Sequence, residues 1–317
     1  MSLVNIDVTL RDGGYRNGFA FDLDYARTHA KLSVAAGFDW VEIAYRKGSF
    51  KQTPDLGLTG RGDDEYIAAI ADEVGAGHVG LILHPKNIDG EDIPAMYRAG
   101  ARLLRVCVPA GDPAAAWDCV RQAKEVGFTV CVNLTRVSQI DAAKVVGLTV
   151  AAADAGADVL YLADSNGSLL PAQTAKLTTL CHSVASCAIG LHAHNNLGLA
   201  MSNALSAVQA GATWMDSSLL GMGKGPGNLV AEHWIAYLNR LDPDGGYDLG
   251  TVLYLADLLG SSVPESAPSL PLPDLVLGHF DLSVESRSSI VHDDHRHAVN
   301  LARTLSSGQA LAGSAAG

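Results

Sequence analysis

Glycine residues mark a repeated joint along this chain, and that joint limits the folds the chain can adopt. Five helical patterns end at a glycine that an apolar run follows almost at once, at Gly37, Gly100, Gly127, Gly156 and Gly211. Glycine just past a helix adopts the left-handed conformation that ends it. Because helices then separate consecutive strands, the strands must pair in parallel.

Short apolar runs alternate with amphipathic ones from residue 3 to about residue 240. The predicted strands are 3–9, 38–45, 78–84, 102–108, 128–134, 157–163, 188–194 and 212–218. The predicted helices are 23–36, 63–74, 91–99, 113–126, 141–155, 171–185, 198–210 and 228–239. Eight such units favour a (β/α)₈ barrel. An open doubly wound sheet is the alternative, because periodicity alone does not show closure.

The pattern weakens after residue 240, so we expect a barrel over 1–240 and a short, partly helical extension over 241–317. Leu249 to Leu259 is typical of one more helix, and residues 261–273 are rich in Ser and Pro, which indicates a loop. The small residues of 308–317 predict a flexible tail.

Charge and composition exclude several classes of partner. The net charge is −12 and no cluster of Lys or Arg stands out, so we expect neither nucleic acid nor an anionic membrane as a partner. The N-terminus lacks a signal-peptide pattern, and no apolar run is long enough to span a bilayer. The five cysteines are scattered and mostly in apolar runs, as in the core of a protein from a reducing compartment. We therefore expect a cytoplasmic protein.

His192 and His194 lie at the end of a predicted strand, two residues apart, so their side chains point to the same face. Two imidazoles side by side form half of a divalent-metal site if a carboxylate lies opposite. Asp12, just after the apolar run 3–8, can supply it. The alternative is a pair of hydrogen-bonded histidines without a metal.

Other polar residues follow the predicted strands, and active sites of (β/α)₈ barrels lie at those ends. They are Arg11, Asp12, Glu42, His84, Arg105, Asn133, Asp164, His192, His194 and Asp216. A ring of polar groups in a barrel mouth indicates a site, because such groups are costly to bury unpaired. Some can instead pair with one another, and Glu42 with Arg105 and Asp164 with Asn133 are candidate pairs.

A glycine-rich stretch, residues 221–228, follows the last predicted strand and ends at Asn228. It lacks the spacing of a dinucleotide-binding fingerprint and the ending of a P-loop. It is therefore interpreted either as a plain connecting loop or as a loop whose backbone approaches a ligand, with Asn228 aimed at the site.

Taken together, these stretches resemble the DRE-TIM metallolyase (HMGL-like) superfamily, and within it the 4-hydroxy-2-oxovalerate aldolase-like branch. The resemblance lies in residues 9–15 (TLRDGGY), 40–46 (WVEIAYR), 191–197 and 221–228, and it covers residues 1 to about 240. It implies a (β/α)₈ metal-dependent aldolase, a carbon–carbon lyase that joins or separates a pyruvate-like 2-oxo acid and an aldehyde.

The resemblance also implies roles for individual residues. The metal ligands would be Asp12, His192, His194 and Asn228. The ion would be Mn²⁺ first, with Mg²⁺, Co²⁺ or Zn²⁺ as alternatives. Arg11 would donate to the keto oxygen of the 2-oxo acid as negative charge develops there. We name Arg11, Tyr15, Glu42 and His84 as catalytic candidates, and Arg105, Asn133 and Asp164 as substrate-binding candidates.

The chain departs from the aldolases at Tyr15, where they carry a histidine three positions after the metal-binding aspartate. An unperturbed tyrosine, with a pKa near ~10, is a poor base at neutral pH. Tyr15 could act with a lowered pKa, bond the substrate, or leave proton transfer to water or to His84. The loop cysteine of the hydroxymethylglutaryl lyases is also missing, which argues against the thioester lyase itself.

The C-terminal residues 240–317 do not match the helical domain with which the aldolases dock an aldehyde dehydrogenase, so that partner is not expected. A homodimer is expected by analogy alone. Two alternative functions stay open: a Claisen condensation of an acyl-CoA with a 2-oxo acid, and a catalytically silent barrel that binds a ligand.

Overall fold

The computed structural model describes residues 3–50, 55–109 and 111–314, with side chains as far as residue 308. Within these ranges eight parallel strands close into a barrel, each paired with the next in the chain and the last with the first. They are β1 (Val4–Asp7), β2 (Trp40–Arg46), β3 (Val79–Leu83), β4 (Leu103–Val108), β5 (Thr129–Leu134), β6 (Val159–Asp164), β7 (Ala188–Ala193) and β8 (Trp214–Ser217).

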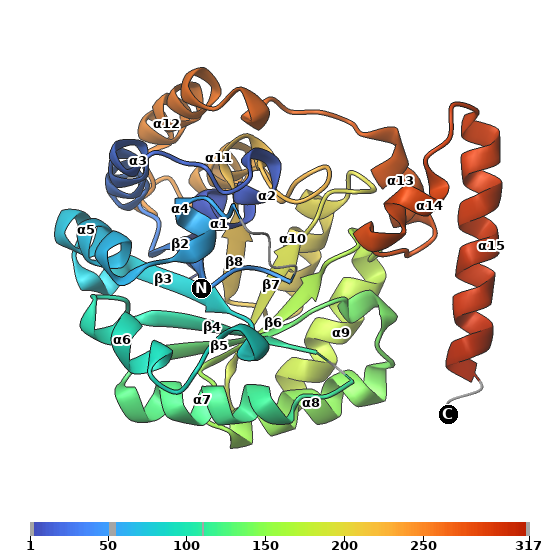
Figure 1. The fold of residues 1–317 in the computed structure, drawn as a ribbon, viewed down its shortest axis with the longest axis horizontal. Coiled ribbons are helices and arrows are strands. Elements are labelled where there is room, and N and C mark those ends of the chain that lie inside the picture. The colour runs from blue at the N-terminus through green and yellow to red at the C-terminus, as the bar shows by residue number, and fades with distance from the viewer. Residues whose placement is uncertain (1–2, 51–54, 110, 315–317) are drawn as a thin grey trace.

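Helices cover the outside of the barrel between consecutive strands (Figure 1). The principal ones are α3 (Leu23–Ala35), α5 (Asp64–Val74), α6 (Asp92–Arg98), α7 (Ala114–Val126), α8 (Ala142–Asp154), α9 (Pro171–Val184), α10 (Ala200–Gln209) and α11 (Ala231–Leu241). The predicted (β/α)₈ barrel is therefore confirmed, and the pairing of β1 with β8 excludes the open sheet. The glycine joints are as expected, since Gly127, for example, has φ of 108° directly after α7.

Three short helical segments near the mouth of the barrel were not predicted: α1 (Thr9–Asp12), α2 (Gly14–Asn17) and α4 (Leu58–Arg61). Four residues make about one turn, which is too short for an apolar periodicity to show. Because β1 ends at Asp7, Arg11 and Asp12 lie on the turn α1 rather than on the strand itself.

The space between the sheet and the helices is filled by apolar side chains. The interior of the barrel contains both apolar and polar side chains. Residues such as Leu81, Val106 and Leu160 are fully buried in the large cluster that includes inward-facing helix residues such as Ile67. A separate buried cluster contains Ile6, Leu103, Cys131, Val159 and Tyr161. Polar side chains occupy the neighbouring interior positions, which the site described below uses.

The strand β2 contains an irregularity that affects the site. Glu42 pairs with Gly80, but Ala44 pairs with Leu81, so Ile43 is an extra residue in the ladder. Such a bulge changes which side chains share a face. As a result Glu42 and Tyr45, three residues apart, are both in contact with interior groups of the barrel.

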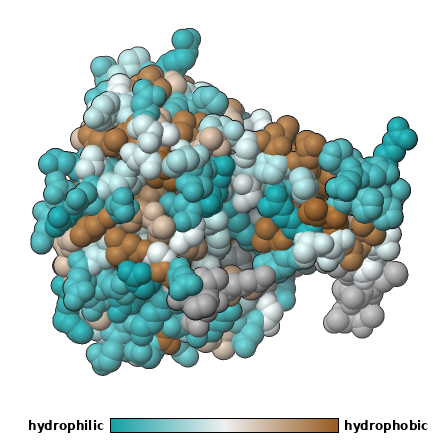
Figure 2. All heavy atoms as spheres, turned by 45° about the horizontal axis from the view of Figure 1, so that its top comes forward, coloured by the Kyte–Doolittle hydropathy of each residue, from teal (hydrophilic) through white to brown (hydrophobic). Residues whose placement is uncertain are grey.

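After α11 the chain forms α12 (Leu249–Ser262), α13 (Leu272–His279), α14 (Arg287–Ile290) and α15 (His295–Ser314). Helix α12 packs beside α3 and α11, so it belongs to the outer layer although the predicted barrel ended at residue 240. Helices α13 to α15 form a lobe beside the barrel, with α15 outermost (Figures 1 and 2). The predicted tail is helical as far as Ser314, and residues 315–317 lie outside the described residues.

Asp281 attaches this lobe to the mouth of the barrel. Its Oδ1 accepts hydrogen bonds from Ser138 Oγ (2.8 Å), Asn166 Nδ2 (2.8 Å) and Ser168 Oγ (2.6 Å), which lie in the loops after β5 and β6. The lobe therefore contributes side chains to the mouth. Among the described residues, no helix combines the length and the apolar character that a bilayer crossing requires.

Candidate metal centre and active site

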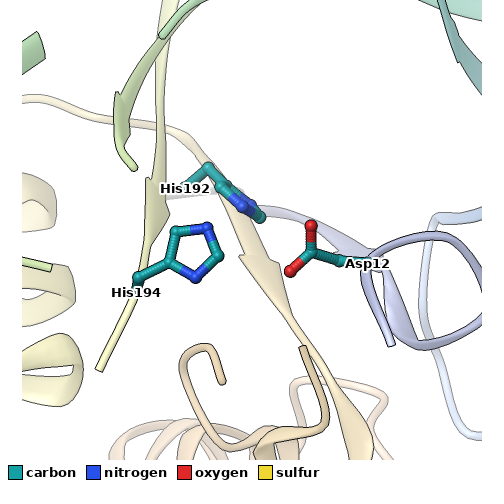
Figure 3. Close-up of side chains that lie close together, drawn as sticks. All are labelled: Asp12, His192 and His194. Carbon is teal, nitrogen blue, oxygen red and sulfur yellow. The ribbon is translucent and has the colours of Figure 1, made fainter. Parts of the chain in front are cut away.

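Asp12, His192 and His194 converge at the C-terminal mouth of the barrel (Figure 3). One ligand atom from each lies within 4.8 Å of the others, and all three side chains are buried. Within the described part of the chain this is the one such group of three or more histidine, cysteine or carboxylate side chains. The structure thus brings together the three residues that the sequence singled out.

The local fold explains why the two histidines face the carboxylate. His192 lies in β7 and His194 just beyond its end, so alternation along an extended chain directs both inward. Their ring centroids are 5.0 Å apart with planes at 87°. An isolated bridge between His194 and Asn228 continues the extended backbone past the strand and brings Asn228 to the same place.

The protonation states of the cluster suit metal binding. Burial raises the pKa of Asp12, but Arg11, His194, His192 and Asn228 together outweigh it and hold that pKa well below its usual range. Burial lowers the pKa of His194 to about 3. An ionised carboxylate beside a neutral imidazole is the state that a divalent cation requires of its ligands.

Asn228 supplies a fourth candidate ligand atom. Its Nδ2 donates to Asp12 Oδ2 at 2.8 Å, while its Oδ1 is buried without a hydrogen-bond partner among the described residues. A buried, unpaired amide oxygen is costly in the absence of a ligand. The set of carboxylate, two imidazoles and an amide oxygen therefore fits a divalent cation.

The glycine-rich loop rests directly on Asp12. A Cβ atom added at Gly223 would lie 2.7 Å from Asp12 Oδ2 and 2.5 Å from Asn228 Nδ2, which no side chain tolerates. The backbone N–H of Lys224 donates to Asp12 Oδ2 at 3.2 Å. The predicted close approach of this loop through its backbone is therefore made to the carboxylate.

A chain of alternating buried charges links two of the candidate ligands, and we call it the charge chain. In order, its members are Asp12, Arg11, Glu42, Arg105, Asp216 and His192. Arg11 bonds both Asp12 and Glu42. Glu42 Oε2 lies 3.0 Å from Arg105 Nε, and Arg105 Nη2 donates to Asp216 Oδ1 at 2.9 Å.

The end of the charge chain fixes the orientation of His192. Its Nδ1 donates to Asp216 Oδ2 at 2.8 Å, which leaves Nε2 as the nitrogen for a metal. The charge chain contains three carboxylates, Asp12, Glu42 and Asp216, but two guanidinium groups, Arg11 and Arg105, so its carboxylates exceed its guanidinium groups by one. A bound cation would offset the charge of the additional carboxylate.

The structure changes the positions expected for several candidates. Glu42 and Arg105 pair with each other, as the alternative interpretation allowed, and both are fully buried behind Arg11. Arg105 also stacks on Tyr161, with its Cζ 4.1 Å from the ring centroid. Since Arg105 is fully buried and does not line the pocket over the cluster, the structure does not place it where a substrate would bind.

Asp164 also lies away from the expected substrate position. Its carboxylate accepts backbone hydrogen bonds from Ser168 (3.1 Å) and Leu169 (3.0 Å) and so holds the loop after β6. Among the described residues, Asp164 and Asn133 form no hydrogen bond with each other. Asn133 by contrast faces the pocket, and its Oδ1 has no partner there.

A pocket of about 70 Å³ opens over the cluster. Among the side chains that line it are the predicted Arg11, Asp12, Tyr15, His84, Asn133, His192 and His194. Lining residues that the prediction did not name include Tyr45, Phe50, Cys107, Arg136, Lys224 and Glu285. Tyr45 and Lys224 lay within the motifs quoted above for the family resemblance, whereas nothing in the sequence marked Glu285 of the distant lobe.

One nitrogen of Arg11, which lines this pocket, has no hydrogen-bond partner among the described residues. Its Nε bonds Glu42 and its Nη1 bonds Asp12, whereas Nη2 is buried with no hydrogen-bond partner among the described residues. Glu42 and Asp12 also raise the pKa of Arg11 against the effect of burial, so the group stays charged. The guanidinium is thus a fixed, charged donor with one open position.

Tyr15 and His84 differ as candidates for proton transfer. Burial raises the pKa of Tyr15, and its hydroxyl lies 3.0 Å from that of Tyr45. The suggestion that Tyr15 acts with a lowered pKa is therefore wrong. Burial, aided by Lys86, Arg11 and Lys224, lowers the pKa of His84 to about 4, so this imidazole is neutral at physiological pH.

The closed barrel and the Asp12–His192–His194 cluster define a metal-binding (β/α)₈ enzyme. More particularly, the chain belongs to the HMGL-like family, whose sequence model matches residues 3–259. This confirms the predicted family and the predicted class, a carbon–carbon lyase.

A similar relative is the 4-hydroxy-2-oxovalerate aldolase of Brevibacillus brevis, which is 30% identical over 277 residues, 87% of this chain and 82% of the relative. Among solved structures, the N-terminal domain of a candidate aldolase from Bacteroides vulgatus has a TM-score of 0.82 at 21% identity, covering 94% of this chain and 99% of that one. The HMG-CoA lyase of Bacillus subtilis has a TM-score of 0.73 at 20% identity, covering 84% and 96%. These two structures support the fold.

Proposed function

We propose that the chain is a divalent-metal-dependent aldolase that cleaves or forms the carbon–carbon bond between a pyruvate-like 2-oxo acid and an aldehyde. The observation that carries the proposal is that Arg11, with an unpaired Nη2, lines the same pocket as Asp12, His192 and His194. The relatives named for an aldolase acting on a 4-hydroxy-2-oxo acid support the same reaction type.

Asp12, His192, His194 and Asn228 would hold the cation. When bound, a divalent cation supplies a Lewis acid for the carboxylate and keto oxygens of a 2-oxo acid. As the bond breaks, its electron pair moves toward the keto oxygen, and Arg11 Nη2 can donate to that oxygen as its negative charge grows. Because Glu42 and Asp12 already orient the guanidinium, the donor needs no rearrangement when substrate arrives.

We assign proton transfer to His84. In the cleavage direction, the substrate hydroxyl gives its proton to the neutral imidazole, and the aldehyde leaves with a new C=O bond. A proton then adds to the carbon of the 2-oxo acid that carried the broken bond. Tyr15 and Tyr45, whose pKa values are raised by burial, serve as neutral hydrogen-bonding groups beside it. Asn133, with its unpaired Oδ1, is the substrate-binding group that we retain.

The first test is deuterium exchange at the methyl group of pyruvate, followed by NMR in D₂O. We expect exchange with Mn²⁺, no exchange with EDTA, and loss of exchange in Asp12→Ala and His194→Ala. His233→Ala, which removes an exposed histidine of α11, is the control and should exchange like the original protein. Bound metal without exchange would mean that pyruvate is not the nucleophile, and release of thiol from acetyl-CoA would then be measured instead.

A second prediction concerns pH. A base with a pKa of about 4 is unprotonated above that value, so kcat/KM at saturating Mn²⁺ should be level between about pH 5 and 8 and fall only below. The groups that set this pKa besides burial are Lys86, Arg11 and Lys224. His84→Gln should lose on the order of a hundredfold or more in rate. An acid limb centred near ~6.5, the value of an unperturbed histidine, would contradict the assignment.

We also propose Mn²⁺ as the ion, the cytoplasm as the location and a homodimer as the assembly. The mixed oxygen and imidazole donors support Mn²⁺ over softer ions. The described cysteines, all with free thiols, support a reducing compartment. The homodimer rests on the family resemblance, and light scattering in solution tests it.

A further inference from the structure

A second cavity adjoins the candidate active site. It has a volume of about 240 Å³ and shares Phe50, His84, Cys107 and Thr135 with the first pocket. The two cavities therefore lie against the same side chains, among them His84, the group to which we assign proton transfer. A ligand held at His84 can extend from one cavity into the other.

The walls of the second cavity are mainly apolar. Beyond the shared residues it is formed by Pro85 and Pro109 of the loops after β3 and β4, and by Ala115 and Ala116 at the start of α7. We call this cavity the apolar annex. Burial raises the pKa of Cys107 to about 12, so its thiol is uncharged and adds to the apolar lining. Charged groups, Lys86 and Asp112, also belong to its lining.

Small residues create the space. Ala115 and Ala116 are consecutive positions of the first turn of α7, and both line the annex with only a methyl group. A cavity of about 240 Å³ has room for a ligand larger than two carbons. By contrast, retro-aldol cleavage of a 4-hydroxy-2-oxovalerate, the compound in the relatives' name, releases a two-carbon aldehyde.

We propose that the apolar annex binds the hydrocarbon tail of the aldehyde, so that this enzyme prefers aldehydes with an extended apolar chain. The inference rests on the proposed aldolase function. The aldehyde oxygen lies at His84, and the tail lies past Phe50 against Ala115 and Ala116. The annex is distinct from the polar pocket in which the 2-oxo acid meets Arg11 and Asp12.

The test is the condensation of pyruvate with linear aldehydes from acetaldehyde to hexanal in the presence of Mn²⁺, measured as kcat/KM for the aldehyde. Burial of each methylene should raise kcat/KM roughly threefold until the annex is full. Pentanal, with three more methylenes than acetaldehyde, should then be favoured by on the order of thirtyfold. A level or falling series in the original protein overturns the proposal.

Two matched variants locate the effect. Ala115→Leu fills the annex from an exposed helix position, and the pentanal-to-acetaldehyde ratio should fall to a few-fold or less. Ala114→Leu alters the neighbouring exposed alanine, which is outside the annex lining, and should keep the original ratio. An unchanged ratio in Ala115→Leu would place the preference elsewhere and overturn this assignment.

The series also separates this inference from the function on which it rests. Metal-dependent exchange at pyruvate with no preference for longer aldehydes overturns the annex proposal alone. Absence of both exchange and condensation overturns the aldolase itself. If the original protein releases thiol from acetyl-CoA and Ala115→Leu abolishes that release, the annex binds the acyl-CoA instead. This result would likewise overturn the proposal.

Discussion

Arg11→Lys should reduce metal-dependent exchange at pyruvate by about a hundredfold to a thousandfold, the cost of losing one preorganised donor to a developing oxyanion. The lysine keeps the positive charge, but one ammonium cannot bond Glu42 and Asp12 and also direct a third donor into the pocket. Calorimetry should show that Mn²⁺ binding weakens far less than the rate, because the ligand atoms of Asp12, His192 and His194 are retained.

The matched control is Arg121→Lys, which alters an arginine that pairs with Asp118 on the surface of α7, where both side chains are more than half exposed. It should leave exchange unchanged. An exchange rate in Arg11→Lys within about fivefold of the original would show that the open Nη2 is not a catalytic donor. A large loss of Mn²⁺ affinity would instead assign Arg11 to the support of Asp12.

The second large effect is expected on metal affinity. Asp216→Asn removes the carboxylate that lies between Arg105 and His192 and orients the imidazole. Loss of such an outer partner of a metal ligand weakens metal binding by roughly tenfold to a hundredfold. The variant also leaves the guanidinium of Arg105 with Glu42 as its remaining charged partner in a fully buried position. We therefore expect the free energy of unfolding to fall by about 3 kcal/mol.

Calorimetry with Mn²⁺ and chemical denaturation of the metal-free protein measure the two effects separately. Asp118→Asn, at the exposed surface pair with Arg121, is the control and should cost less than about 1 kcal/mol. If the Kd for Mn²⁺ changes less than twofold in Asp216→Asn, His192 does not depend on the charge chain for its orientation. Because Asp216 does not line the pocket, an effect on affinity would have to act through His192.

The sequence predicted the barrel well because each strand and helix is long enough to carry its own periodicity. The strands ending at Asp7, Leu83 and Ala193 all lie within the predicted ranges. The three candidate metal ligands could also be predicted from the sequence. His192 and His194 share a strand face by alternation alone, and Asp12 follows the first strand in a recognisable motif.

The rest of the site depended on features that have no local pattern. Strict alternation along β2 would place Glu42 with Ala44 on one face, whereas the bulge at Ile43 brings Tyr45 inward. Arg105 was a substrate-binding candidate with Glu42 as its alternative partner, and the sequence did not show that Asp216 binds it as well. Glu285 reaches the pocket only because Asp281 anchors the lobe to loops more than a hundred residues away.

The pairing of β1 with β8 also determines when the site can exist during folding. Asp12 follows the first strand, His192 and His194 lie at the seventh, and β8 joins the two through the register of Val4 with Trp214. Contacts between residues so far apart in the chain form late, since loop closure must precede them. A chain in which β1 and β8 have not yet paired therefore lacks the assembled cation site. Ion binding should stabilise the closed barrel, so that the barrel opens more slowly as the free ion concentration rises.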